Sequence, residues 1–130
     1  MTVLKIGTTV KEFFKNLNDN FFELSDKNKV LYTGSIDIPT DGATTITLLD
    51  DVTNYDGLIF VRETMDGALY MTPPALGTTY NVVNRTATLN PCTIGTTAFD
   101  AQVTATNKMW LGNNQHEYDF PLIKIIGVKL

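Results

Sequence analysis

The sequence is poor in the residues that most enzymes and metal centres use. Its 130 residues include one cysteine, one histidine and only two serines, Ser25 and Ser35. With Cys92 alone, neither an internal disulfide nor a two-cysteine metal site within one chain is possible, and we expect this residue to act as a small apolar side chain. The motifs of a nucleophile elbow, a phosphate-binding loop and a dinucleotide fingerprint are missing. We therefore expect a protein that is not an enzyme and that holds no cofactor and no metal.

Long hydrophobic runs and clusters of positive charge are missing as well. No run of 18 apolar residues occurs, so no membrane-spanning helix is predicted. The run from Met1 to Phe14 has no apolar core behind basic residues, so we expect no signal peptide and folding in a cytosol. The net charge is −4, and the residues after Leu31 hold twice as many Asp and Glu as Lys and Arg. This acidity argues against a nucleic-acid groove, which needs clustered Lys and Arg.

One stretch, Thr9 to Leu24, has the pattern of a helix. Thr9 and Glu12 have the spacing of a capping box. The apolar residues follow the alternating four- and three-residue steps of a coiled-coil seam; they are Val10, Phe14, Leu17, Phe21 and Leu24. A lone helix of about 16 residues is marginal in water. We therefore expect this seam to pack on copies of itself, although Phe13 and Phe22 widen the apolar face and leave packing on the base of a β-domain open.

From Val30 onward the apolar residues mostly recur at the period of β-strands. The predicted strands are residues 30–38, 43–49, 58–64, 68–72, 78–84, 85–89, 97–106, 108–112 and part of 120–130. The third is an almost continuous apolar run and is predicted to be a central strand. Asp66-Gly67 is predicted to give the hairpin after it the positive φ that such turns need. Phe99, Ala101, Val103 and Ala105 are expected on one face of their strand.

About seven to nine short strands with frequent turns predict a mainly β protein, an antiparallel β-sandwich with a jelly-roll-like arrangement. The expected organisation has two parts. Residues 1–29 form an N-terminal arm and an amphipathic oligomerisation helix, and residues 30–130 form the β-sandwich head domain.

Several acidic residues have spacings that catalytic or metal sites also use. Glu63 with Asp66, and Glu117 with Asp119, are carboxylate pairs of the kind a glycosidase needs, although acids in turns are more often solvated. The segment 52–63 partly fits an EF-hand loop, but Val52 stands where the motif requires Asp, and we interpret the match as coincidence. Two alternatives remain. One is a looser calcium site formed by Asp50, Asp51 and Asp56, and the other is a metal site formed by His116 with Glu117 and Asp119.

Sugar sites on β-sandwiches pair a flat aromatic ring with planar polar side chains. Trp110 is the only tryptophan, and polar residues follow it closely. Elsewhere Tyr70 offers a second ring and Arg62 a guanidinium. The predicted carbohydrate-binding residues are Trp110, Tyr70, Arg62, Asn113, His116 and Glu117. The alternative interpretation places Trp110 in the core of its strand.

Three stretches resemble known proteins. The run Tyr32 to Val61, YTGSIDI followed by TTITLLDDVTNYDGLIFV, is similar to the head domains that end many tail-fibre and baseplate proteins of phages of Gram-positive bacteria. The run Leu122 to Lys129, LIKIIGVK, is similar to the ending of such chains, with Val128 where Tyr is usual. Leu17 to Leu24, LNDNFFEL, looks like a helix of phage fibre proteins. Together the three stretches cover about half of the chain, and none is a catalytic motif.

The resemblance implies a virion component assembled in the host cytoplasm. It would be a homotrimer in which an N-terminal three-helix bundle is tied to other tail, baseplate or capsid proteins and the heads bind host cell-surface saccharide. No nucleic-acid partner and no membrane insertion are expected. A purely structural head fibre or decoration subunit that docks through its N-terminal helix is the alternative, and a fibre with hydrolase activity is a third hypothesis. Residues 65–118 match nothing in the family, and their loops are expected to carry any receptor specificity.

Overall fold

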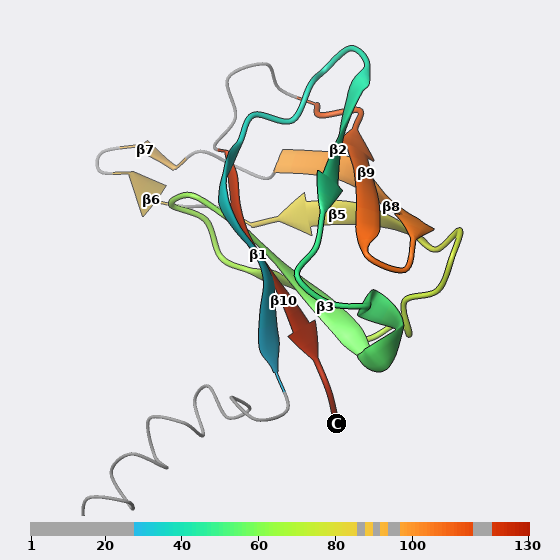
Figure 1. Cartoon of the computed structure of the whole chain (residues 1–130). Coiled ribbons are helices and arrows are strands. Elements are labelled where there is room, and N and C mark those ends of the chain that lie inside the picture. Colours follow the sequence, from blue (N-terminus) through green and yellow to red (C-terminus); the bar gives the residue numbers. More distant parts are fainter. Residues whose placement is uncertain (1–27, 86–87, 90–91, 94–96, 116–120) are drawn as a thin grey trace, which may run out of the picture.

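Figure 1 shows the computed structural model of the chain, which describes residues 28–85, 88–89, 92–93, 97–115 and 121–130. The predicted helix Thr9 to Leu24 lies outside the described residues, and with it the whole seam of Val10, Phe14, Leu17, Phe21 and Leu24. Within the described part, no helix is long and apolar enough to cross a membrane.

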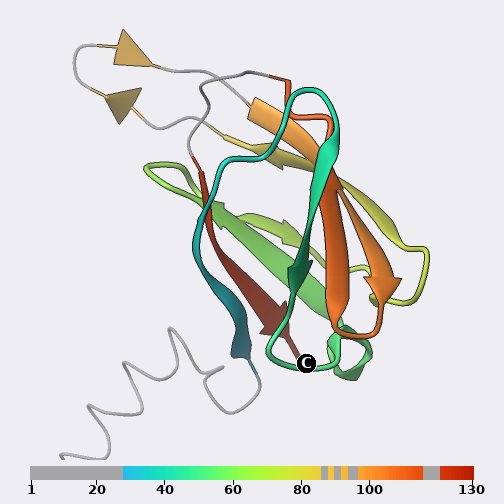
Figure 2. The same cartoon turned by 45° about the horizontal axis from the view of Figure 1, so that its top comes forward.

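Two four-stranded antiparallel sheets face each other, as the views in Figure 1 and Figure 2 show. The first sheet has the order β1 (Lys29–Ile36), β10 (Leu122–Val128), β3 (Gly57–Arg62) and β4 (Ala68–Tyr70). The second has the order β2 (Ala43–Thr47), β9 (Lys108–Gly112), β8 (Thr97–Ala105) and β5 (Thr79–Asn84). A small hairpin of β6 (Thr88–Leu89) and β7 (Cys92–Thr93) stands apart, and a 3-10 turn, η1 (Val52–Asn54), precedes β3. The prediction of a mainly β protein with two antiparallel sheets is confirmed.

Strand limits differ from the sequence-based ones where the chain changes sheets. β2 ends at Thr47 because the next two amides bond to different sheets. The Leu48 N–H donates to Asn107 O, in the turn between β8 and β9, at 2.7 Å, whereas the Leu49 N–H donates to Leu31 O in β1, also at 2.7 Å. Of the predicted strand 85–89, Thr88 and Leu89 are paired, whereas Arg85 is not in a strand and residues 86–87 lie outside the described residues. β3 lies between β10 and β4, as a central strand should.

The turn after β3 also differs in its chemistry. The residue with positive φ is Thr64, at +61°, and not Gly67. The Met65 N–H donates to Arg62 O at 3.1 Å and closes a four-residue turn before the Asp66-Gly67 pair is reached. Gly67 is required for space: a Cβ there would lie 2.9 Å from Ile59 Cγ2. The prediction that Asp-Gly supplies the positive φ is therefore wrong.

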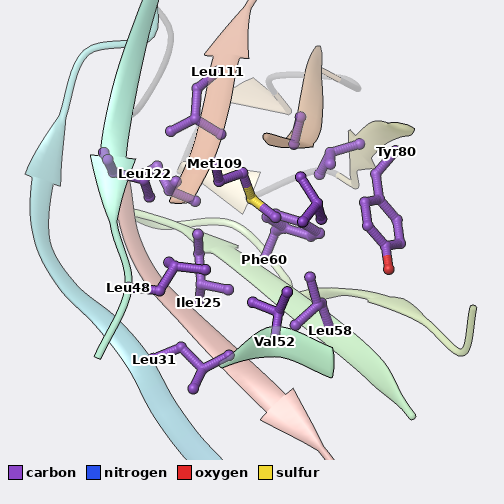
Figure 3. Packing of buried hydrophobic residues seen from close by; sticks show 14 of the residues in the cluster. Leu31, Leu48, Val52, Leu58, Phe60, Tyr80, Met109, Leu111, Leu122 and Ile125 are labelled. Atoms are coloured by element: carbon purple, nitrogen blue, oxygen red, sulfur yellow. The ribbon is translucent and has the colours of Figure 1, made fainter. Parts of the chain in front are cut away.

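The core lies between the two sheets. Figure 3 shows Met109 of β9 beside Phe60 of β3, with Leu111 and Leu58 in the same cluster of side chains. These side chains are fully buried, because alternate residues of each strand point inward. The ring of Phe60 packs tilted against Tyr80 at 5.6 Å and edge-on against Phe99 at 6.0 Å. On β8 the predicted inward face is confirmed for Phe99, Ala101 and Val103, whereas Ala105 is only half-buried.

The outer faces of the two sheets have different chemistry. On the outer face of the second sheet the outward-pointing residues are mainly polar, among them Thr45, Asn81, Asp100 and Gln102. The first sheet instead carries four aliphatic side chains in register across its four strands, an arrangement we term the aliphatic row; it consists of Val30, Ile126, Ile59 and Leu69.

The residues before and after β1 lie at opposite ends of the sandwich. At one end the Lys129 N–H donates to Asn28 Oδ1 at 3.1 Å, so the start of the described chain and its C-terminus lie together (Figure 1). At the other end Asn114 donates through its backbone N–H to Pro39 O at 3.0 Å and through Nδ2 to Ile38 O at 2.9 Å. The junction with residues 1–27 and the loop after β9 are therefore at opposite ends.

Candidate functional site

Trp110 lies on the outer face of the second sheet and not in the core. Its neighbours along β9, Met109 and Leu111, are fully buried, so the alternation of the strand turns Trp110 outward, where it is half-buried. It stands between Thr45 of β2 and Gln102 of β8. The interpretation of Trp110 as a core residue is thus wrong, because its strand has only one face toward the core.

The indole leans along β9 over Gly112. A Cβ on Gly112 would lie 2.8 Å from Trp110 Cη2 and 2.8 Å from Gly42 O, which leaves no space for any other residue. Gly112 is paired with Ala43 on one side and Asp100 on the other. The glycine therefore lets the ring extend toward the row of the sheet that contains Asp100.

Asp100 is held by two amide side chains. Asn81 Nδ2 donates to Asp100 Oδ1 at 2.9 Å, and Asn113 Nδ2 donates to Asp100 Oδ2 at 2.9 Å. Asn113 reaches back because its backbone is left-handed, with φ at 52°, a conformation that Asn tolerates better than most residues. The Asn81 and Asn113 hydrogen bonds, which favour the charged form, hold the pKa of Asp100 below its usual value of 3.8.

Trp110, Gly112, Asp100, Asn81 and Asn113 form one continuous surface, which we term the Trp110 platform. It combines a half-buried aromatic ring on the outer face of the sheet with an ionised carboxylate whose two oxygens each have a lone pair left. The amide oxygens of Asn81 and Asn113 are further acceptors. Such a surface suits a polyhydroxylated ligand, because C–H groups pack on the ring while hydroxyls donate to the carboxylate. A carboxylate with a lowered pKa is a hydrogen-bond acceptor and is poorly suited to donating a proton to a leaving group.

Tyr70 is not part of this platform. Its hydroxyl donates to Asn81 O at 2.8 Å and accepts from the Val83 N–H at 2.9 Å. These are the backbone groups that β5, an edge strand, would offer to another strand, so the phenol blocks this edge. The ring packs against Phe60 and Tyr80 and lines a cleft of about 390 Å³ between β4 and β5.

Arg62 is buried, with 1% of its surface exposed, and its side chain extends from β3 of the first sheet to residues of the second sheet and of the loop after β9. Its Nη1 donates to Thr97 Oγ1 at 2.7 Å and its Nη2 to Asn114 Oδ1 at 3.3 Å. The guanidinium lies 5.0 Å from the centre of the Phe99 ring. The expectation of a guanidinium available to sugar hydroxyls therefore does not hold for this structure, because the group is enclosed by β8 and the loop after β9.

The acidic loop before β3 has structural roles. Asp50 accepts from the Tyr55 hydroxyl at 2.7 Å and from the Asp51 N–H at 2.8 Å, and both bonds lower its pKa. Asp51 caps η1 by accepting from the Thr53 N–H, and Asp56 accepts from the Leu130 N–H. Desolvation and the bond to Asp50 raise the pKa of Tyr55 to about 12.

Across the described residues, no group of three His, Cys, Asp or Glu side chains is arranged to hold a metal ion. The EF-hand interpretation fails on its first position, because Val52 is fully buried and begins a 3-10 turn. Glu63 and Asp66 are exposed on the turn after β3.

His116, Glu117 and Asp119 lie outside the described residues. Of the predicted carbohydrate residues, the structure thus brings Trp110 and Asn113 into one surface and places Tyr70 and Arg62 elsewhere. Sequence reasoning missed Asp100 and Asn81. The alternation that puts Phe99 inward already puts Asp100 outward, but the pairing of β5 with β8 and β8 with β9 was needed to bring these residues together.

Comparison of the chain with protein-family models, with curated proteins and with solved structures found no match.

Proposed function

We propose that this protein is a phage virion component, a tail or baseplate adhesin that is not an enzyme and whose β-sandwich head binds a host cell-surface glycan through the Trp110 platform. The observation that carries this proposal is the outward indole beside a carboxylate held ionised by two amides. The resemblance of Tyr32 to Val61 and of Leu122 to Lys129 to phage head domains supports the virion assignment. The jelly-roll-like arrangement is part of the proposal, supported by the long-range pairs β1–β10 and β2–β9.

The positions of the two ends support the same assignment. Asn113 of the platform follows β9 at the end where Asn114 bonds to Pro39, whereas the chain from residues 1–27 joins at Asn28, at the opposite end. An N-terminal helix that associates with copies of itself and docks on other virion proteins would leave the platform pointing outward. A homotrimer of this kind would gain avidity from three weak sites.

Binding to an array of bacterial cell-wall saccharides and to whole cells tests the proposal. Trp110→Ala removes the ring, and Asp100→Asn keeps the shape but removes the charge. We expect each to weaken binding at least about tenfold, because one charge-assisted hydrogen bond or one ring contact contributes about 1–3 kcal/mol. Asp66→Asn is the matched control, since it makes the same charge change at an exposed turn of the other sheet, and it should leave binding unchanged.

A purely structural virion subunit is the second candidate, and the aliphatic row favours it because such a face suits assembly contacts. A correctly folded chain that binds neither saccharides nor cells would establish this alternative. Release of reducing ends from wall material would instead indicate the hydrolase hypothesis.

A further inference from the structure

The aliphatic row is an apolar surface on a sheet face with no layer of described residues over it. Val30 at one edge is 38% exposed and Leu69 at the other is 56% exposed, with Ile126 and Ile59 half-buried between them. Met71, which is 42% exposed, extends this surface. Gly57 shares a face of β3 with Ile59, and the Sδ of Met71 lies 2.9 Å from the position that a Cβ of Gly57 would take on that face. A sheet with one solvated face normally alternates apolar and polar residues, and β3 and β10 do not.

The second sheet of the same molecule shows the ordinary alternation. Its outward positions are mainly polar and include Thr45, Asn81, Asp100 and Gln102, while Trp110 and Val83 are apolar residues on the same face. The aliphatic row is therefore a property of one face and not of the composition of the whole domain. Aliphatic side chains aligned across four strands are expected where a partner covers the sheet.

We propose that the aliphatic row packs against the aliphatic rows of the neighbouring copies of this chain, around the axis that the assembled copies share. The inference rests on the proposed assembly through the N-terminal segment. That segment, residues 1–27, joins the described chain at Asn28, which the Lys129 N–H fixes to the end of the first sheet. Val30 is two residues further on, within about 7 Å of chain. Copies joined through the segment therefore bring the Val30 ends of their rows close together.

The size of the surface favours a tethered copy over an independent partner. Four strands span about 15 Å, so the row and Met71 cover only part of the roughly 800 Å² per partner that a stable complex of free proteins buries. Chains joined at their N-terminal segments meet at effective concentrations of about millimolar, at which a small apolar contact is enough. β10 contains one charged residue, Lys124, which is paired with Val61 and lies beside the row.

The test is the mass of the full chain against concentration, by light scattering, for wild type, Leu69→Lys and Met71→Lys. Leu76→Lys is the matched control, because Leu76 is 63% exposed and lies in the connection between β4 and β5, outside the row. We expect the concentration for half-dissociation to rise at least tenfold for the two row variants and to stay within threefold for the control. Both row positions are exposed, and circular dichroism checks that the variants fold.

Three results would overturn the inference. An oligomer that dissociates equally in all variants would leave the N-terminal assembly standing and remove the row from it. A wild-type mass near 14.4 kDa at every concentration would remove both. A monomeric chain in which Leu69→Lys lowers the melting temperature and Leu76→Lys does not would mean that the N-terminal segment of the same chain covers the row.

Discussion

Replacing Arg62 by Met tests whether this buried arginine supports the fold or contacts a ligand. The substitution removes the hydrogen bonds from Nη1 to Thr97 and from Nη2 to Asn114, and the contact with the Phe99 ring. Hydrogen bonds to charged groups contribute about 1.5–3 kcal/mol each, and a desolvated cation–π contact about 2 kcal/mol. Against this, Met needs no desolvation of a charge, which recovers several kcal/mol.

The partners that remain decide the balance. Asn114 is buried, and its Oδ1 loses the Arg62 donor, whereas Thr97 keeps its contact from Oγ1 to Met65 Sδ at 3.4 Å. An unsatisfied buried acceptor costs about 1–3 kcal/mol. We expect a net loss of about 3 kcal/mol in the free energy of unfolding, within the range for breaking a buried polar pair from one side. With a slope of about 1.5–2 kcal/mol per M urea, the unfolding midpoint should fall by about 1.5–2 M.

The control is Arg85→Met, the same substitution at an exposed arginine, for which a change within about 0.5 kcal/mol is expected. Urea unfolding followed by circular dichroism gives both midpoints. Equal midpoints for the two variants would refute the structural role of Arg62. Loss of glycan binding in a fully folded Arg62→Met chain would refute its burial away from the ligand.

Three further predictions concern the platform and the sheet edge. Because hydrogen bonds lower the pKa of Asp100, its carboxylate stays ionised at any pH above the ordinary value of 3.8. Glycan binding should therefore be constant from about pH 5 to 8 and should fall only below 3.8. The stability that these bonds give to the fold is likewise complete above 3.8 and is lost as the pH falls through the lowered pKa. A loss of binding near neutral pH would show that another group titrates. Gly112→Ala should displace the indole of Trp110 and destabilise the fold by about 1–3 kcal/mol, measured by the unfolding midpoint and by Trp fluorescence, whereas an unchanged emission spectrum would contradict the close approach at 2.8 Å. Tyr70→Phe should cost about 0.5–1.5 kcal/mol and increase self-association at high concentration, because it frees the Val83 N–H at the edge of β5; a chain as stable and as monodisperse as its parent would show that the edge needs no blocking.

The sequence by itself determined which residues of a strand share a face. Alternation along residues 97–106 was enough to place Phe99, Ala101 and Val103 in the core, because a strand repeats every two residues whatever its neighbours are. The apolar run from Leu58 likewise predicted an inner strand, which β3 is. The limits of β2 and the turn at Thr64 were missed, since they depend on hydrogen bonds to residues distant in sequence or on local backbone geometry that the Asp-Gly pattern does not describe.

Only the tertiary structure decided which side chains work together. Arg62 looked available in the sequence, but the last inward position of β3 points it between the sheets. Asp100, Asn81 and Asn113 are separated by up to 32 residues, and they meet because β5, β8 and the end of β9 are neighbours in one sheet. The aliphatic row needs the register of four strands, three of them joined across long stretches of chain. Alternation is local and can be read along the chain, whereas strand order and register are long-range, and these two properties place the Trp110 platform on one sheet and the aliphatic row on the other.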